Sequence, residues 1–158
     1  MKQNCGNITG ANPQIERIKW VYVITAFAAF VGGVAIYAFF RNIDNLVVFH
    51  FFPKPLFLGS LSAPVRPGTL PGYLFVYNLP HGLWCLSGLM VIRVIWLTNI
   101  KWRAIYGGLF LVVISALEIS QLSENRNGTF DVLDLISYGF FAFVESLAYN
   151  TFIKRSIV

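Results

Sequence analysis

The chain has 158 residues, of which 56% are hydrophobic and only 12% are charged. Soluble domains carry about 25% charged residues, so this composition excludes an ordinary soluble enzyme and a disordered chain. The formal net charge is +5, but the basic residues stand at the ends of apolar runs and do not gather on one wet face. That pattern excludes a nucleic-acid-binding domain and indicates a compact multi-pass membrane protein.

The first apolar run covers residues 20–40 and follows a polar tail, residues 1–19. Its length matches the roughly 20 residues that a helix needs to cross the hydrocarbon. The run is too long for the core of a signal peptide, so we expect it to remain as a membrane anchor. Gly32 and Gly33 in its middle are expected to allow close packing against another helix.

The next segment, residues 42–80, contains six prolines, which disfavour any long helix. Two stretches within it, residues 47–52 and 73–77, are nevertheless apolar and aromatic. Bare irregular backbone cannot face lipid. We therefore expect an irregular outer segment that lies in the interface or dips back into the protein. It is interpreted either as a lid over a site or as a passive interfacial belt.

Three further spans are predicted at about residues 81–98, 103–123 and 132–153, followed by a short tail, 154–158. The expected fold is all-α: a bundle of four transmembrane helices that forms one integral membrane domain, residues 20–153. Basic residues favour the cytoplasmic side, which predicts an inner-membrane protein with both termini in the cytoplasm. The two tails and the turn at residues 99–103 would share the cytoplasmic side and hold seven basic residues: Lys2, Arg17, Lys19, Lys101, Arg103, Lys154 and Arg155. The opposite side holds four: Arg41, Lys54, Arg66 and Arg126.

Three ionisable residues, Arg93, Glu118 and Glu145, fall inside the spans, where each costs roughly 2.5–3.5 kcal/mol without a partner or a task. Arg93 lies about 4.5 Å beyond the middle of the second span toward the cytoplasm, and Glu145 lies at a similar depth in the fourth. We expect these two to form a buried ion pair whose main role is to fix helix register.

A second polar group is predicted near the outer boundary of the membrane. Glu118 and Gln121 share a face of the third span, while Asp131 and Asp134 share a face at the start of the fourth. A short turn joins the two helices, so they are antiparallel neighbours. This group is either a functional site or a structural network of helix caps and dipole partners. Its candidate members are Glu118, Gln121, Asp131, Asp134, Tyr138, His81 and Arg126.

The stretch Glu118-Ile-Ser-Gln121, followed by Gly128-Thr-Phe-Asp131-Val-Leu-Asp134, resembles the signature of the VanZ-like family of small bacterial membrane proteins. The entry His81-Gly-Leu-Trp84 is similar to that of related families. The resemblance covers roughly residues 73–150. It departs at Tyr138, where the family often has Asn, and at His81, where an acid is more common. It implies a bacterial inner-membrane protein linked to the cell envelope and, in the family's namesake, to glycopeptide-antibiotic resistance.

Three functions remain open from the sequence. The first is binding or processing of an envelope lipid or amphiphile at the outward-facing acidic site. A carboxylate would then act as acid or base, or hold a divalent cation, the one candidate cofactor. The second is a non-enzymatic assembly subunit that contacts other membrane-protein subunits. The third, a pore or proton-coupled carrier, is weakened because no polar stripe crosses the membrane. The sequence leaves catalysis undecided and favours its absence; membrane lipids are the expected partners and nucleic acid is not.

Overall fold

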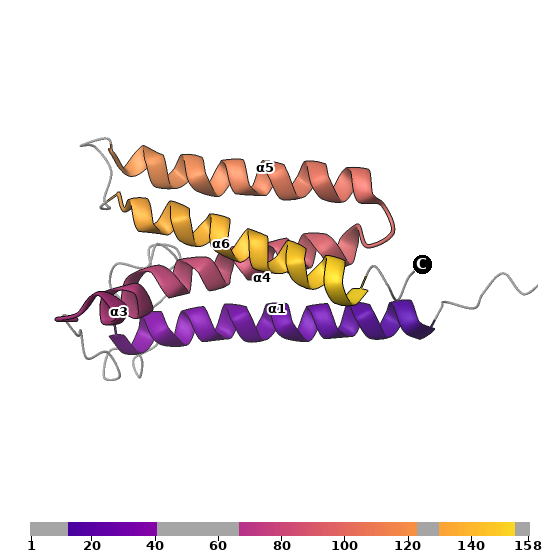
Figure 1. The fold of residues 1–158 in the computed structure, drawn as a ribbon, viewed down its shortest axis with the longest axis horizontal. Coiled ribbons are helices and arrows are strands. Elements are labelled where there is room, and N and C mark those ends of the chain that lie inside the picture. The colour runs from indigo at the N-terminus through magenta and orange to yellow at the C-terminus, as the bar shows by residue number, and fades with distance from the viewer. Residues whose placement is uncertain (1–12, 41–66, 123–129, 154–158) are drawn as a thin grey trace, which may run out of the picture.

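The computed structural model describes residues 13–40, 67–122 and 130–153, and these form a bundle of helices with no strand among them (Figure 1). Four helices are long and apolar enough to cross a membrane: Pro13–Phe40, Leu70–Ile95, Ile100–Leu122 and Val132–Thr151. The prediction of an all-α protein with four membrane spans is therefore confirmed, and the chain is an integral membrane protein.

The described elements follow one another along the chain with short changes of helical type. The first span is α1, Pro13–Phe40. The second begins with α3, Leu70–Tyr73, passes through a π turn, Leu74–Asn78, and continues as α4, Leu79–Ile95. The third is α5, Ile100–Ile119, which ends in a 3₁₀ turn, Ser120–Leu122. The fourth is α6, Val132–Ala148, which ends in a π turn, Tyr149–Ile153.

The second span starts earlier than the sequence predicts, at Leu70 and not at His81. The expected irregular structure is therefore wrong for residues 70–80, while residues 42–66 lie outside the described part of the chain. Pro71 stands in the first turn, where its missing N–H is not needed, and Thr69 caps that turn. Pro80 stands in the first turn of α4, just after the π turn, a wider turn that a helix can accommodate as a local bulge.

The first helix also starts earlier than its apolar run, because α1 includes the polar residues from Pro13 onward. These residues suit a helix outside the hydrocarbon: Glu16 and Lys19 form an exposed ion pair of 2.8 Å one turn apart. The ends of the third and fourth spans agree with the predicted limits to within a few residues. Hydropathy locates the part of a helix in lipid, and the helix itself extends past it.

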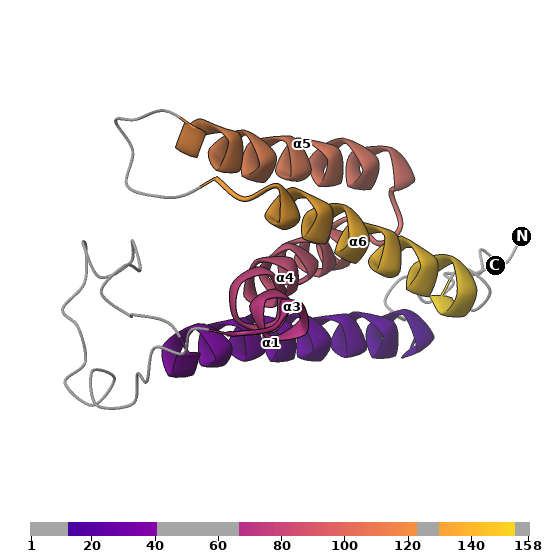
Figure 2. The same ribbon diagram turned by 60° about the vertical axis from the view of Figure 1, so that its left-hand side comes forward.

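The central helix of the bundle is α4, which packs against α1, α5 and α6. In Figure 2, α1 and α5 lie on opposite sides of it. Gly82 and Gly33 allow two of these contacts. A Cβ on Gly82 would lie 2.3 Å from the Phe141 ring of α6, and one on Gly33 would lie 2.6 Å from Nε1 of Trp84. Gly33 thus has the packing role that the sequence suggested, whereas a Cβ at Gly32 would meet only an ordinary contact, 3.7 Å from Leu83.

The charges are divided between the two ends of the bundle. The start of α1, the connection from α4 to α5 and the end of α6 lie at one end (Figure 1). All five lysines and arginines of the described residues lie toward this end, here called the basic end: Arg17, Lys19, Arg93, Lys101 and Arg103. The opposite end, here called the acidic end, holds Glu118, Asp131 and Asp134.

Arg93 of α4 and Glu145 of α6 form a buried, bidentate ion pair. Both residues are at least nine-tenths buried, and the Arg93 guanidinium also lies 4.1 Å from the centre of the Tyr149 ring. The pairing agrees with the depth of the two residues in their spans. The pair joins α4 to α6 toward the basic end, away from Glu118, Asp131 and Asp134. It therefore contributes to packing of the helices and not to the polar group at the acidic end.

Candidate functional site

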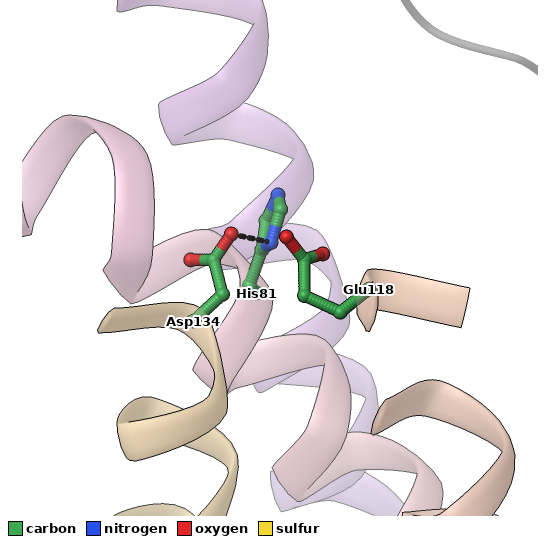
Figure 3. A group of neighbouring side chains, drawn as sticks. All are labelled: His81, Glu118 and Asp134. Atoms are coloured by element: carbon green, nitrogen blue, oxygen red, sulfur yellow. Dashed lines mark ion pairs between the residues drawn. The ribbon is translucent and has the colours of Figure 1, made fainter. Parts of the chain in front are cut away.

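Three side chains from three helices converge at the acidic end (Figure 3). His81 lies in the first turn of α4, Glu118 near the end of α5 and Asp134 in the first turn of α6. Each offers one nitrogen or oxygen atom, and the three atoms all lie within 4.8 Å of one another. Among the described residues, the turns where α4 and α6 begin and α5 ends therefore build one cluster of His and carboxylates.

The cluster is buried but reachable from one side. Glu118 and Asp134 are only 3% and 5% exposed, whereas the His81 side chain retains 20% of its exposure. A ligand would therefore approach along His81 and meet two carboxylates that are already removed from bulk water. In such surroundings a cation interacts with the carboxylates more strongly than it would in water.

The ring of His81 is held by aromatic stacking. It lies parallel to Trp84, with the ring centres 5.8 Å apart, and Trp84 in turn stacks on Tyr37 of α1 at 5.9 Å. This places Nδ1 of His81 2.9 Å from Oδ2 of Asp134. The contact has the distance of an ion pair but not the alignment of a hydrogen bond, so the buried Nδ1 has no hydrogen-bond partner. A buried nitrogen of this kind is available to a ligand.

Asn78 holds the two aspartates. Its amide nitrogen donates to Oδ1 of Asp134 at 2.7 Å and to Oδ2 of Asp131 at 3.3 Å. Asn78 is 3% exposed, and its own oxygen has no hydrogen-bond partner in the described structure. Buried polar atoms without partners are uncommon in proteins, and two of them, on Asn78 and His81, belong to this one site.

Asp131 forms the N-cap of α6 and links the site to its surroundings. Its Oδ1 accepts from the Leu133 N–H at 2.9 Å, its Oδ2 accepts from the Tyr73 hydroxyl at 2.9 Å, and its own N–H donates to Glu118 at 3.2 Å. Partial burial by itself would raise the pKa of the Asp131 carboxyl. The hydrogen bonds from Leu133, Tyr73 and Asn78 outweigh burial and hold this pKa below its ordinary value.

Gln121 and Tyr138 differ in how they join the group. Gln121 donates to Oε2 of Glu118 at 2.9 Å, as their spacing suggested. Tyr138 lies near Asp134 and Glu118, and its carbonyl accepts from the Cys85 thiol at 3.8 Å. Arg126, a candidate member of this group, lies outside the described residues.

Asn78 and Tyr73 are not among the residues predicted from the sequence, because the prolines around them favour an irregular segment over a helix. A usable signal was present. Asn78 is an amide inside an apolar run, three residues before His81, and in a continuous helix the two would share a face. Tyr73 belongs to the aromatic stretch interpreted as a lid or a belt, and in the structure it contacts the site through Asp131.

The donor set fits a divalent cation. Among the described residues, Glu118 and Asp134 converge on the imidazole of His81, and Asp131 stands one turn before Asp134; when these carboxylates are ionised, one imidazole does not balance them. One imidazole with carboxylates is a ligand set suited to Zn²⁺, Mn²⁺ or Fe²⁺. Asn78 and Gln121 hydrogen-bond to the carboxylates from outside, which is how such ligands are usually oriented.

Comparison of the chain with protein-family models, with curated proteins and with solved structures found no match.

Proposed function

We propose that this integral membrane protein binds a divalent first-row transition-metal ion at His81, Glu118 and Asp134, and through it the anionic headgroup of an envelope lipid or amphiphile. The observation that carries the proposal is the convergence of three ligand atoms within 4.8 Å at one end of the bundle. The proposed activity is binding, without a chemical step.

The distances support binding of a single ion. Ligand atoms that lie 2.0–2.2 Å from one ion are at most about 4.4 Å apart. The three ligand atoms lie within 4.8 Å of one another, so the longest separation must close by at most about 0.4 Å if those two ligands are opposite each other on the ion, and by at most about 1.3 Å if the ion is tetrahedral. The imidazole favours a transition metal over Mg²⁺ or Ca²⁺, which prefer oxygen ligands alone.

The position of the cluster is the reason for proposing an amphiphile as the ligand. It stands at the end of helices whose outer faces are apolar and exposed, including Leu117, Ile119 and Val132 beside the site. A molecule with its chains in the membrane can therefore bring a headgroup to the level of His81. An ion held by three protein side chains retains open positions, and phosphate oxygens are common ligands for such positions.

The test uses the purified full chain in detergent, loaded with Mn²⁺ or Zn²⁺, dialysed and analysed by mass spectrometry for bound metal. We expect about one ion per chain, and a loss of affinity of at least about tenfold in E118Q and D134N, since even the residues behind metal ligands are worth 10–100-fold. E16Q, the same change at an exposed acid of the basic end, serves as the matched control. A melting temperature for each variant separates loss of metal from loss of fold.

Headgroup binding is tested separately, with a short-chain phosphatidic acid titrated in the presence of Mn²⁺ or of EDTA. Binding that requires the metal and is lost in D134N supports the whole proposal. Bound metal without lipid binding overturns the headgroup, and lipid binding that EDTA leaves unchanged overturns the bridging ion. A wild-type chain that binds neither overturns the function.

A non-enzymatic assembly subunit is the second candidate, and one observation favours it. Most polar atoms of the site already have partners inside the protein: Asn78, Gln121, Tyr73 and the Asp131 N–H all donate to its carboxylates. Such a network can lock helices together without a ligand. D134N that unfolds the protein, with no metal bound to the wild type, would support this candidate.

The membrane and the orientation belong to the same proposal. We propose the bacterial inner membrane, with both termini cytoplasmic and the acidic end outward. The five described lysines and arginines lie toward the end that would then face the cytoplasm, in agreement with the positive-inside rule. Membership of the VanZ-like family rests on the motif around Glu118, Asp131 and Asp134 and would be consistent with an envelope role.

A further inference from the structure

A pocket of about 270 Å³ lies at the basic end, between α4, α5 and α6. Arg93, Glu145 and Arg103 form its polar part, and Gly107 and Gly108 of α5 line its other side. Gly108 and the neighbouring Ala104 are exposed, so the pocket opens onto the outer surface of α5. It is separate from the cluster of His81, Glu118 and Asp134, because the start of α4, the end of α5 and the start of α6 lie at the opposite end of the bundle (Figure 1).

The pocket carries one positive charge in excess. Arg93 is neutralised by Glu145, but Arg103 has no carboxylate within ion-pair distance in the described parts of the chain. One of its nitrogens donates to the Leu97 carbonyl at 3.2 Å, and its guanidinium lies 4.2 Å from the Tyr149 ring centre. A guanidinium has five N–H donors, so capping the end of α4 leaves most of them free for an anion.

Aromatic residues place this pocket at the level of lipid headgroups. Trp96, Trp102 and Tyr106 form a cluster around the α4–α5 connection, with ring centres 5.3–6.0 Å apart. Trp102 and Tyr106 are about 40% exposed. Exposed Trp and Tyr gather at the boundary between hydrocarbon and water, so Arg103, next to Trp102 in the chain, lies at that boundary too.

We infer that the pocket binds an anionic phospholipid of the leaflet at the basic end, with the lipid phosphate on Arg103 and an acyl chain over Gly108. Basic pockets between transmembrane helices are typical sites for anionic headgroups. The volume is below the roughly 300–1,000 Å³ that encloses a whole drug-sized ligand, so the headgroup enters and the chains stay outside. A Cβ at Gly108 would meet nothing within 4 Å, which leaves open space for a chain.

The experiment measures lipid retention by native mass spectrometry of the full chain, released from detergent containing equal amounts of phosphatidylglycerol and phosphatidylcholine. We expect the wild type to retain phosphatidylglycerol preferentially and R103Q to lose about fivefold of that preference, the effect of one basic residue at a membrane surface. K101Q removes the same charge from an exposed neighbour that does not line the pocket, so it should change the preference clearly less than R103Q does. G108L, which fills the opening without changing charge, should also reduce retention.

Three results would overturn the inference. The wild type could retain both lipids equally, K101Q could lose as much preference as R103Q, or G108L could retain phosphatidylglycerol like the wild type. Displacement of the lipid by millimolar inorganic phosphate would also count against it, because it would make the free anion the ligand. If R103Q does not fold, G108L decides, because a Cβ at Gly108 clashes with no atom within 4 Å and the variant should fold.

Discussion

The buried pair of Arg93 and Glu145 allows the sharpest test of how this bundle is held together. In E145Q the side chain keeps its size, but the Arg93 guanidinium remains buried without a carboxylate. Removing one partner of a buried ion pair costs about 3–5 kcal/mol. The Tyr149 ring lies 4.1 Å from the guanidinium with or without the Glu145 carboxylate, so its contribution of about 1 kcal/mol cancels in the comparison. We therefore expect E145Q to lower the free energy of unfolding by about 3–5 kcal/mol.

The assay is equilibrium unfolding in mixed micelles of a mild detergent and dodecyl sulfate, followed by circular dichroism. A double-mutant cycle of R93Q and E145Q gives the coupling energy, which should exceed about 1.5 kcal/mol, the lower end for close charge pairs. The exchange R93E/E145R should recover a large part of the loss seen in either single reversal.

The chain offers a matched control, the ion pair of Glu16 and Lys19, whose side chains are 45% and 38% exposed. The cycle of E16Q and K19Q should give less than about 1 kcal/mol, as exposed pairs do. Equal coupling energies for the two pairs would refute the argument that burial makes the Arg93 pair important. A charge exchange no more stable than the single reversals would refute direct pairing.

Two further predictions concern packing and pH. G82A should lower the free energy of unfolding by about 1–3 kcal/mol, because its Cβ would lie 2.3 Å from the Phe141 ring. The control G139A should not lower it, because a Cβ at that position meets nothing within 4 Å. The same micelle assay compares the two variants, and equal effects would contradict the close approach of Gly82 to Phe141. The lowered pKa of Asp131 means that its carboxylate stabilises the fold above its ordinary pKa of 3.8 and that this stabilisation is lost as pH falls through the lowered value. Stability curves of the wild type and D131N, which keeps an N-cap residue, should therefore differ at neutral pH and converge in acid; a constant difference would contradict the assignment.

Sequence and physical chemistry predict most of this fold, because lipid restricts what a chain can do. Each span needs about 20 consecutive apolar residues, so the apolar runs along the chain locate four helices. Depth counted along two helices then pairs Arg93 with Glu145, since an unpaired charge in the membrane is costly. The sequence also places Glu118 near Asp134, because two helices joined by a short turn are antiparallel neighbours. These inferences need only the rise per residue and the cost of burying a charge.

The sequence did not predict the helix over residues 70–80. Proline disfavours a helix interior by roughly 3 kcal/mol, but the penalty depends on position, and neither Pro71 nor Pro80 interrupts a regular α-helical interior. Asn78 and Tyr73 are missed together with the helix that carries them. Their hydrogen bonds to the aspartates span more than 50 residues in sequence, and no local pattern specifies such contacts without the fold.

The interface between α4 and α6 helps to separate a structural role from a ligand site. Polar contacts occur toward both of its ends, Asn78 with Asp134 and Arg93 with Glu145, while Gly82 packs on Phe141 between them. A slip of one helical turn would break both contacts, so the register is fixed by an amide–carboxylate hydrogen bond and by an ion pair. Neither contact between α4 and α6 uses Glu118. Glu118 nevertheless reaches from α5 to within ligand distance of His81 and Asp134. Like charges this close raise each other's energy. Gln121 and the Asp131 N–H already donate to Glu118, as a structural network requires, whereas the proposed cation would in addition neutralise the surplus of ionised carboxylates.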